Sequence, residues 1–98
     1  MTENKYQIHL KKRLKQEFPN SIITKMDAND IQGIPDILIL HNKNWAALEC
    51  KKDGQASKRP NQEYYVDKMN NMSFARFVYP DNEEDVINEL HKAFRSWR

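Results

Sequence analysis

Two apolar runs, IPDILIL at residues 34–40 and WAALECKK at residues 45–52, decide the fold of this chain. Each run is short and rich in residues that favour extended structure, as expected of a β-strand. Residues 41–44 (HNKN) between them favour a hairpin turn, because asparagine tolerates the backbone angles that turns require. The sequence therefore predicts a β-hairpin around which the other elements are organised.

Three charged residues interrupt this hairpin. Asp36 opens the first strand, whereas Glu49 and Lys51 lie two residues apart near the end of the second strand and share one face of it. Since the strands of a hairpin run in opposite directions, we expect Asp36 to lie close to Glu49 and Lys51. A surface hairpin with solvated charges is the alternative, but apolar residues on both faces of both strands argue against it. Buried charges are costly unless they bind something, so the pattern favours a functional site.

Apolar residues at helical spacing predict three helices. The first covers residues 3–18 and has Thr2 as its N-cap. The second covers residues 60–71. The third begins at Asp81, which forms a capping box with Glu84, and we assign its acidic first turn no catalytic role.

Two further strands are expected at residues 21–26 and 73–79. The predicted order is αβββαβα, an α/β (α+β) arrangement. A chain of 98 residues is long enough for one small domain, so residues 1–98 are assigned to a single domain.

Two polar residues on the helices are additional candidates. Glu3 extends the apolar stripe of the first helix, where it either faces the helix dipole or acts as a third carboxylate near Asp36. Gln62 lies on the inward face of the second helix, where it either bonds to backbone or points at the charged end of the hairpin. The residues alone leave both pairs of alternatives open.

Composition limits the function classes. Hydrophobic residues make up 39% and charged residues 31% of the chain, as expected of a soluble globular domain. No apolar run approaches the ~20 residues of a membrane span, and the N-terminus lacks the apolar region of a signal peptide. The single cysteine, Cys50, fits a cytoplasmic protein. The net charge is only +2, so a nucleic-acid partner has to be argued from local basic groups.

Carboxylates on adjacent strands suit a hard divalent cation, Mg²⁺ or Mn²⁺, with positions left for water and a phosphate oxygen. Such a metal polarises a phosphate and lowers the pKa of bound water, and a nearby lysine offsets the charge that builds on the phosphorus. Asp36, Glu49 and Lys51 therefore suit phosphodiester hydrolysis. Zinc is a poor alternative, because Cys50 has no histidine at ligand spacing.

The same residues resemble a known family. Pro35-Asp36, twelve intervening residues and then Glu49-Cys50-Lys51 match the signature of the PD-(D/E)XK nucleases. The lead Gly33-Ile34 and the downstream Pro60-Asn61-Gln62 resemble the VRR-NUC branch, in its short stand-alone form from phages and prophages. The likeness extends from Glu3 to about Tyr79.

The resemblance implies a restriction-endonuclease-like core, with a four-stranded mixed sheet flanked by helices. It implies that Asp36, Glu49 and the backbone carbonyl of Cys50 are metal ligands and that Lys51 is the catalytic lysine. Gln62 and, with less specificity, Glu3 match supporting residues of the active site. The Cys50 side chain is expected to face away from the metal.

The implied activity is metal-dependent cleavage of DNA, and stand-alone members resemble Holliday-junction resolvases that act as homodimers. Branched DNA such as a four-way junction is therefore the expected substrate, in the cytoplasm of a bacterial host. A sequence-preferring nicking or homing-type endonuclease and a non-catalytic DNA-binding module are the alternatives. Basic candidates for DNA contact are Lys52, Lys58 and Arg59, and less clearly the lysines of the first helix. Candidate dimer contacts are Phe94 with Trp97, or Tyr64 with Tyr65.

Overall fold

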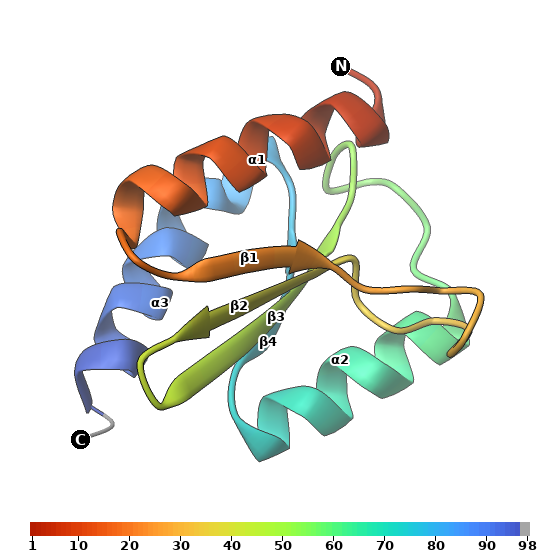
Figure 1. The fold of residues 1–98 in the computed structure, drawn as a ribbon. Coiled ribbons are helices and arrows are strands. Elements are labelled where there is room, and N and C mark those ends of the chain that lie inside the picture. Colours follow the sequence, from red (N-terminus) through yellow and green to blue (C-terminus); the bar gives the residue numbers. More distant parts are fainter. Residues whose placement is uncertain (97–98) are drawn as a thin grey trace.

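The computed structural model describes residues 1–96 and has the element order that the sequence predicts (Figure 1). The elements are α1 (Glu3–Glu17), β1 (Ile22–Lys25), β2 (Ile37–His41), β3 (Asn44–Cys50), α2 (Pro60–Met72), β4 (Ala75–Val78) and α3 (Glu83–Ser96). A 3-10 turn at Pro80–Asn82 leads into α3.

The four strands form one sheet in the order β1-β2-β3-β4. β1 pairs with β2 and β2 with β3 in antiparallel fashion, whereas β3 and β4 are parallel. The parallel pair needs a crossover, which α2 supplies. The sheet is therefore mixed, as expected.

The central hairpin is tighter than the sequence suggested. His41 pairs with Asn44, so the turn contains only Asn42 and Lys43 rather than four residues. Asn42 has a φ of 57°, a left-handed conformation that asparagine tolerates better than most residues. The register that follows pairs Ile37 with Leu48 and so brings the start of β2 to the end of β3.

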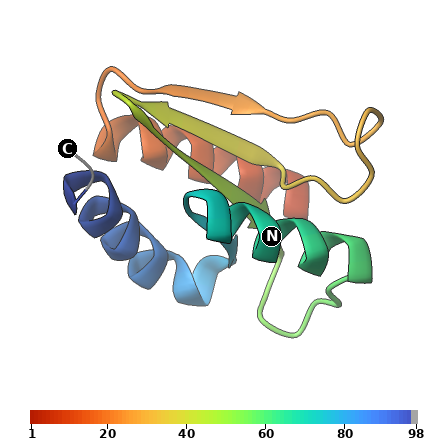
Figure 2. The ribbon, with the colours of Figure 1, turned by 90° about the horizontal axis from the view of Figure 1, so that it is seen from below.

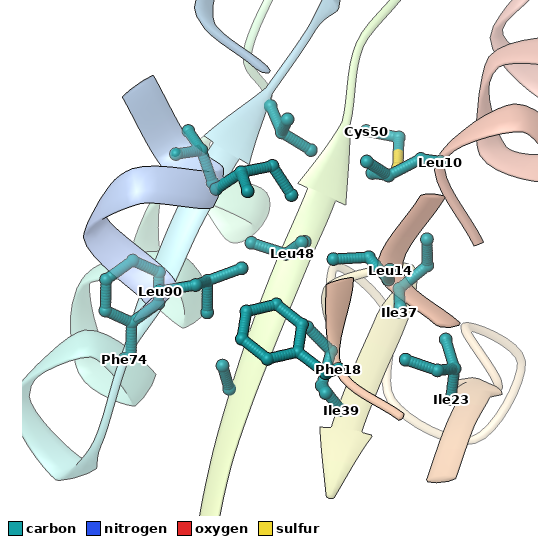
Figure 3. Close-up of a cluster of buried hydrophobic side chains, with 14 of the residues drawn as sticks. Leu10, Leu14, Phe18, Ile23, Ile37, Ile39, Leu48, Cys50, Phe74 and Leu90 are labelled. Atoms are coloured by element: carbon teal, nitrogen blue, oxygen red, sulfur yellow. The ribbon is translucent and has the colours of Figure 1, made fainter. Parts of the chain in front are cut away.

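Helices cover both faces of the sheet (Figure 1). The larger core lies between one face and α1 with α3, and it contains Leu10, Leu14, Ile39, Leu48 and Leu90, all fully buried (Figure 3). The smaller core lies under α2 and is built on Ala47, Val66 and Ala75. Alternate residues of β3 thus serve opposite faces, as the two-residue period of a strand requires.

The two outer helices begin differently from one another. The Thr2 hydroxyl accepts a hydrogen bond from the backbone N–H of Lys5 at 3.2 Å, which confirms the predicted cap of α1. The predicted cap at Asp81 is wrong. Instead the Asn82 side chain accepts from the backbone N–H of Tyr79 at 2.8 Å, and the 3-10 turn delays α3 until Glu83.

Aromatic residues proposed as dimer contacts differ in exposure. Phe94 belongs to the larger core, where its ring contacts Phe18, so this residue is not a free surface. Tyr64 is 56% exposed and Tyr65 is half-buried. Trp97 lies outside the described residues.

Among residues 1–96, no helix combines the length and apolar character that crossing a membrane requires.

Candidate active site

Asp36 and Glu49 face each other at one end of the sheet. Asp36 immediately precedes β2, and the register places it opposite Glu49 near the end of β3. The Asp36 Oδ2 atom accepts a hydrogen bond from the backbone N–H of Cys50 at 2.9 Å. Glu49 is only 3% exposed and Asp36 is half-buried. The predicted proximity of the two carboxyl groups is confirmed, and their burial argues against a solvated surface pair.

The environment of this pair opposes two negative charges. Burial raises the pKa of Glu49 to about 8, and the charge of Asp36 adds to the shift. Burial also raises the pKa of Asp36, although the hydrogen bond from the Cys50 N–H acts in the opposite direction. Near neutral pH the pair therefore retains a proton in the absence of a cation, because the second charge is not stabilised by water.

Lys51, two residues after Glu49, completes the cluster. Its side chain is buried, and Nζ donates to Oε1 of Gln62 at 2.7 Å and lies 3.9 Å from Oε2 of Glu49. The same Gln62 oxygen accepts from the backbone N–H of Arg59 at 3.2 Å, so it is fixed at the start of α2. Of the two interpretations of Gln62, the structure thus shows both a backbone bond and a contact with the charged end of the hairpin.

Cys50 separates the cluster from the core. Its side chain is fully buried in the larger core, near Leu10 (Figure 3), which is the orientation that the sequence predicted. Burial raises the pKa of the thiol well above its usual range, so the side chain is an apolar group at neutral pH. The backbone of Cys50, rather than its side chain, contacts the carboxylate pair.

Three hollows surround the cluster and share walls. The main cleft, of about 680 Å³, is lined by Glu3, Lys51, Lys52, Asp53, Gln55, Ala56, Ser57, Arg59 and Gln62. A groove of about 540 Å³ beside α1 is lined by Glu3, Asn4, Gln7, Lys25, Met26, Asp27, Ala28, Asn29 and Asp36. A smaller side pocket of about 260 Å³ is lined by Ala28, Gln32, Gly33, Ile34, Asp36, Glu49, Arg59, Asn61 and Gln62. A substrate therefore has access to the cluster from several directions.

Glu3 stands at the rim of the site. It is exposed in the first turn of α1, and it lines both the main cleft and the α1 groove. Its negative charge also contributes to the raised pKa of Glu49, after burial and the charge of Asp36, whereas the positive charge of Lys51 acts in the opposite direction. Both interpretations of Glu3 thus hold in part: it is a first-turn acid, and it belongs to the wall of the site.

The basic candidates separate into two groups. Lys52 and Arg59 are exposed and line the main cleft, beside Lys51. Lys58 instead lies with Nζ 4.8 Å from the centroid of the Phe77 ring and lines a different groove, between α2 and β4. Figure 2 shows the loop of residues 51–59 that carries all three extending beyond the end of the sheet to the start of α2.

The donor set fits a hard cation. Among residues 1–96, no group of three or more His, Cys, Asp or Glu side chains is placed to hold a metal ion. At the cluster, the side-chain oxygens available to a metal ion are therefore those of Asp36 and Glu49. Mg²⁺ suits such a site, because it is commonly bound through one or two carboxylates together with waters and substrate phosphates.

Sequence reasoning missed one buried carboxylate outside this cluster. Glu83 is 6% exposed, accepts from the Tyr6 hydroxyl at 2.8 Å and pairs with Arg13 Nη1 at 2.7 Å. These bonds connect α3 to α1, so the burial of Glu83 has a structural explanation. Its spacing of three and seven residues from Val86 and Leu90 places it on the buried stripe of α3, a signal that was present in the sequence.

Comparisons with known proteins bear on the fold. Models of protein families give no match to this chain, and curated proteins give none either. Among solved structures, one described as "VRR_NUC domain" matches with a TM-score of 0.69 at 20% sequence identity. The match covers 94% of this chain and 96% of that chain. The chain therefore has the fold of a VRR_NUC domain, in agreement with the resemblance of its motifs to that branch of nucleases.

Proposed function

We propose that this protein is a metal-dependent DNA endonuclease that hydrolyses phosphodiester bonds. The observation that carries the proposal is the convergence of Asp36, Glu49 and Lys51 at one end of a sheet whose fold is that of a VRR_NUC domain. A buried and a half-buried carboxylate, both of raised pKa, face each other at a cost in free energy that a bound cation would offset.

Asp36, Glu49 and the backbone carbonyl of Cys50 would hold Mg²⁺ or Mn²⁺. When bound, such an ion polarises the phosphate and lowers the pKa of a coordinated water. Lys51 contributes a buried positive charge beside the carboxylates, where it stabilises the negative charge that develops on the phosphate oxygens. Gln62 holds the ammonium group of Lys51 in place through its 2.7 Å hydrogen bond.

DNA would occupy the main cleft. Lys52 and Arg59 line its wall and supply positive charge next to the cluster, while Lys58 would contact phosphates further along, in the neighbouring groove. Local basic groups of this kind supply most of the sequence-independent affinity for DNA, even where net charge is small.

A four-way junction, resolved by a symmetric homodimer, is the proposed substrate. Resolution needs two cuts on strands related by a twofold axis, and a chain with one cluster supplies two such sites as a C2 dimer. Ile22 and Leu40 support a self-interface. They pair across β1 and β2 and are 61% and 39% exposed, so part of the sheet remains uncovered by helices.

A cleavage assay tests the activity. Four-way junction, flap and linear duplex are each incubated with Mg²⁺, Mn²⁺ or Zn²⁺, using Asp36→Asn as the inactive control. We expect paired, symmetric nicks in the junction with Mg²⁺ or Mn²⁺. Cleavage supported by Zn²⁺ alone would contradict the ligand assignment, and equal cutting of linear duplex would contradict the preference for branched DNA.

Light scattering tests the dimer. The wild type should have the mass of two chains at micromolar concentration, and Leu40→Lys should shift it toward one chain. Ile8→Lys is the matched control, since Ile8 is also exposed (59%) but lies on α1, away from this face. A wild-type protein that stays monomeric would contradict the dimer without affecting the proposed chemistry.

A further inference from the structure

The side pocket next to the carboxylate pair has walls that the proposed hydrolysis does not use. Gln32, Gly33 and Asn61 line it together with Arg59, and Asp36 and Glu49 form the wall that it shares with the cluster. Its volume of about 260 Å³ is below the ~300–1,000 Å³ of pockets for drug-sized ligands, so it suits one small group.

Two amide side chains are available in this pocket. Asn61 is half-buried and Gln32 is exposed, and neither side chain has a hydrogen-bond partner within residues 1–96. An amide offers both donors and an acceptor, which match the mixed edge of a neutral heterocycle. Asparagine and glutamine pair with base edges in this way in other complexes.

The charges of the pocket argue against an anion. Asp36 and Glu49 on one wall supply no positive charge, since the cation proposed for the cluster only balances them, and Arg59 is the single basic residue among the lining side chains. A planar guanidinium such as that of Arg59 also stacks on aromatic rings. A neutral, planar ligand with polar edges therefore fits this lining better than a phosphate or a sugar-phosphate.

The shape of the pocket is fixed by a close backbone contact. Gly33 has a φ of 93°, and a Cβ atom placed on it would lie 2.8 Å from Cγ of Asn61. The loop before β2 thus packs directly on the first turn of α2, and Figure 1 shows this loop beside the start of that helix. A pocket built between two such fixed segments is preorganised for its ligand.

We propose that the side pocket binds the base of the nucleotide next to the phosphate that is cut. The base leaves its stack and enters between Asn61 and Arg59, so that the pocket reads that nucleotide while the main cleft holds the backbone. Unstacking costs least where strands are unpaired or branched, which links base binding to the branched substrate. This inference rests on the proposed nuclease function.

Nuclear magnetic resonance tests the pocket without cleavage. The four deoxynucleosides are titrated at millimolar concentration, without metal, into ¹⁵N-labelled protein, and the side-chain NH₂ signals of Asn61 and Gln32 are followed. We expect both signals to shift with at least one nucleoside and the effect to vanish in Asn61→Ala. Asn71→Ala is the matched control, because Asn71 is exposed at the far end of the same helix. The absence of any shift with all four nucleosides would overturn the inference.

A second experiment measures the role during cleavage. A pool of junctions randomised around the cut is digested with wild type, Asn61→Ala and Asn71→Ala, and the product ends are sequenced. Asn61→Ala should lose the base preference at the position beside the cut, and Asn71→Ala should keep it. A base preference that is unchanged in Asn61→Ala would overturn the inference, although the cleavage itself would still support the nuclease function. A wild type that does not cut would contradict the nuclease function, and the nucleoside titration would then decide whether the pocket binds a base.

Discussion

The ammonium group of Lys51 and the side-chain oxygen of Gln62 are 2.7 Å apart and join the end of β3 to the first turn of α2. Lys51 is nearly inaccessible to solvent, so Gln62 replaces part of the water that the ammonium group has lost. The bond therefore fixes both the position and the solvation of the charge that, in the proposed reaction, faces the phosphate.

The first prediction removes this bond. Gln62→Leu should lower kcat about 10- to 100-fold, in the range seen when a supporting partner of a catalytic group is lost. The buried lysine that remains unsatisfied should also cost about 1–3 kcal/mol of stability. The rates are measured under single-turnover conditions and the stability by urea unfolding.

Gln16→Leu is the control for this substitution, because Gln16 is exposed on α1. Gln62→Glu separates the two effects, since a carboxylate still accepts from Lys51 but adds a negative charge. Wild-type rates in Gln62→Leu would show that Lys51 does not need this partner.

The second prediction concerns Asp36 and Glu49. Asp36→Asn and Glu49→Gln should each abolish cleavage, and calorimetry with Mn²⁺ should show the loss of metal binding, because a neutral amide is a poor ligand for a hard cation. The fold should persist, since both replacements keep the size of the buried group.

Glu63→Gln is the matched control, because Glu63 is exposed on α2. It should retain both metal binding and cleavage. Full activity in Glu49→Gln would exclude this carboxylate from the reaction and with it the proposed site.

The third prediction is a dependence of stability on pH. Burial raises the pKa of Glu49 from 4.5 to about 8, so between these values the folded protein holds a proton that the unfolded chain releases. The contribution of Glu49 to the free energy of unfolding should therefore be greatest below about pH 4.5 and should fall as pH rises toward 8, by at most about 1.4 kcal/mol per unit. Burial shifts the pKa of Asp36 in the same direction.

Thermal unfolding at several pH values, without metal, measures this dependence. Glu49→Gln should flatten it and should be more stable than wild type near pH 8. Added Mn²⁺ should stabilise the wild type most at high pH, because binding displaces the retained proton. A wild type that becomes more stable between pH 5 and pH 8 without metal, relative to Glu49→Gln, would contradict the assigned direction.

The hairpin shows how much of this site was accessible from the sequence. The alternation of side chains along β3 places Glu49 and Lys51 on one face, and the antiparallel register brings Asp36 to Glu49. Both follow from local geometry, so the proximity was predictable. The contact of Lys51 with Gln62 was one of two alternatives that the sequence left open, because it depends on how α2 packs against the sheet.

Other residues show why sequence reasoning stopped short. Lys58 and Arg59 are adjacent in the chain, yet they line different grooves. The side chain of Lys58 lies on the ring of Phe77 in β4, whereas Arg59 directly precedes α2 and lines the main cleft. Sequence reasoning assigns the acidic first turn of α3 no catalytic role and does not predict that Glu83 in this turn is buried and accepts a hydrogen bond from Tyr6. In both cases the deciding contact comes from an element distant in the sequence.

The last prediction concerns the DNA surface. Each phosphate contact releases counterions, so the loss of one contact should reduce the slope of log affinity against log salt by roughly one. Lys52→Ala, Lys58→Ala and Arg59→Ala should each show this reduction, measured on a junction by fluorescence anisotropy without added metal. Lys43→Ala is the control, because Lys43 lies in the turn at the opposite end of the β2–β3 hairpin and should leave the slope unchanged.

The three lysine and arginine variants also distinguish two paths of the DNA. Lys52 and Arg59 line the main cleft, so a strand confined to that cleft changes its salt slope with these two residues alone. Lys58 lies at the groove between α2 and β4. A reduced salt slope in Lys58→Ala would therefore indicate a DNA strand that continues past the loop of residues 51–59. We expect all three to respond, because a branched substrate extends beyond a single cleft. An unchanged slope for Lys58→Ala would confine the DNA to the main cleft, and unchanged slopes for Lys52→Ala and Arg59→Ala would remove that cleft from the binding surface.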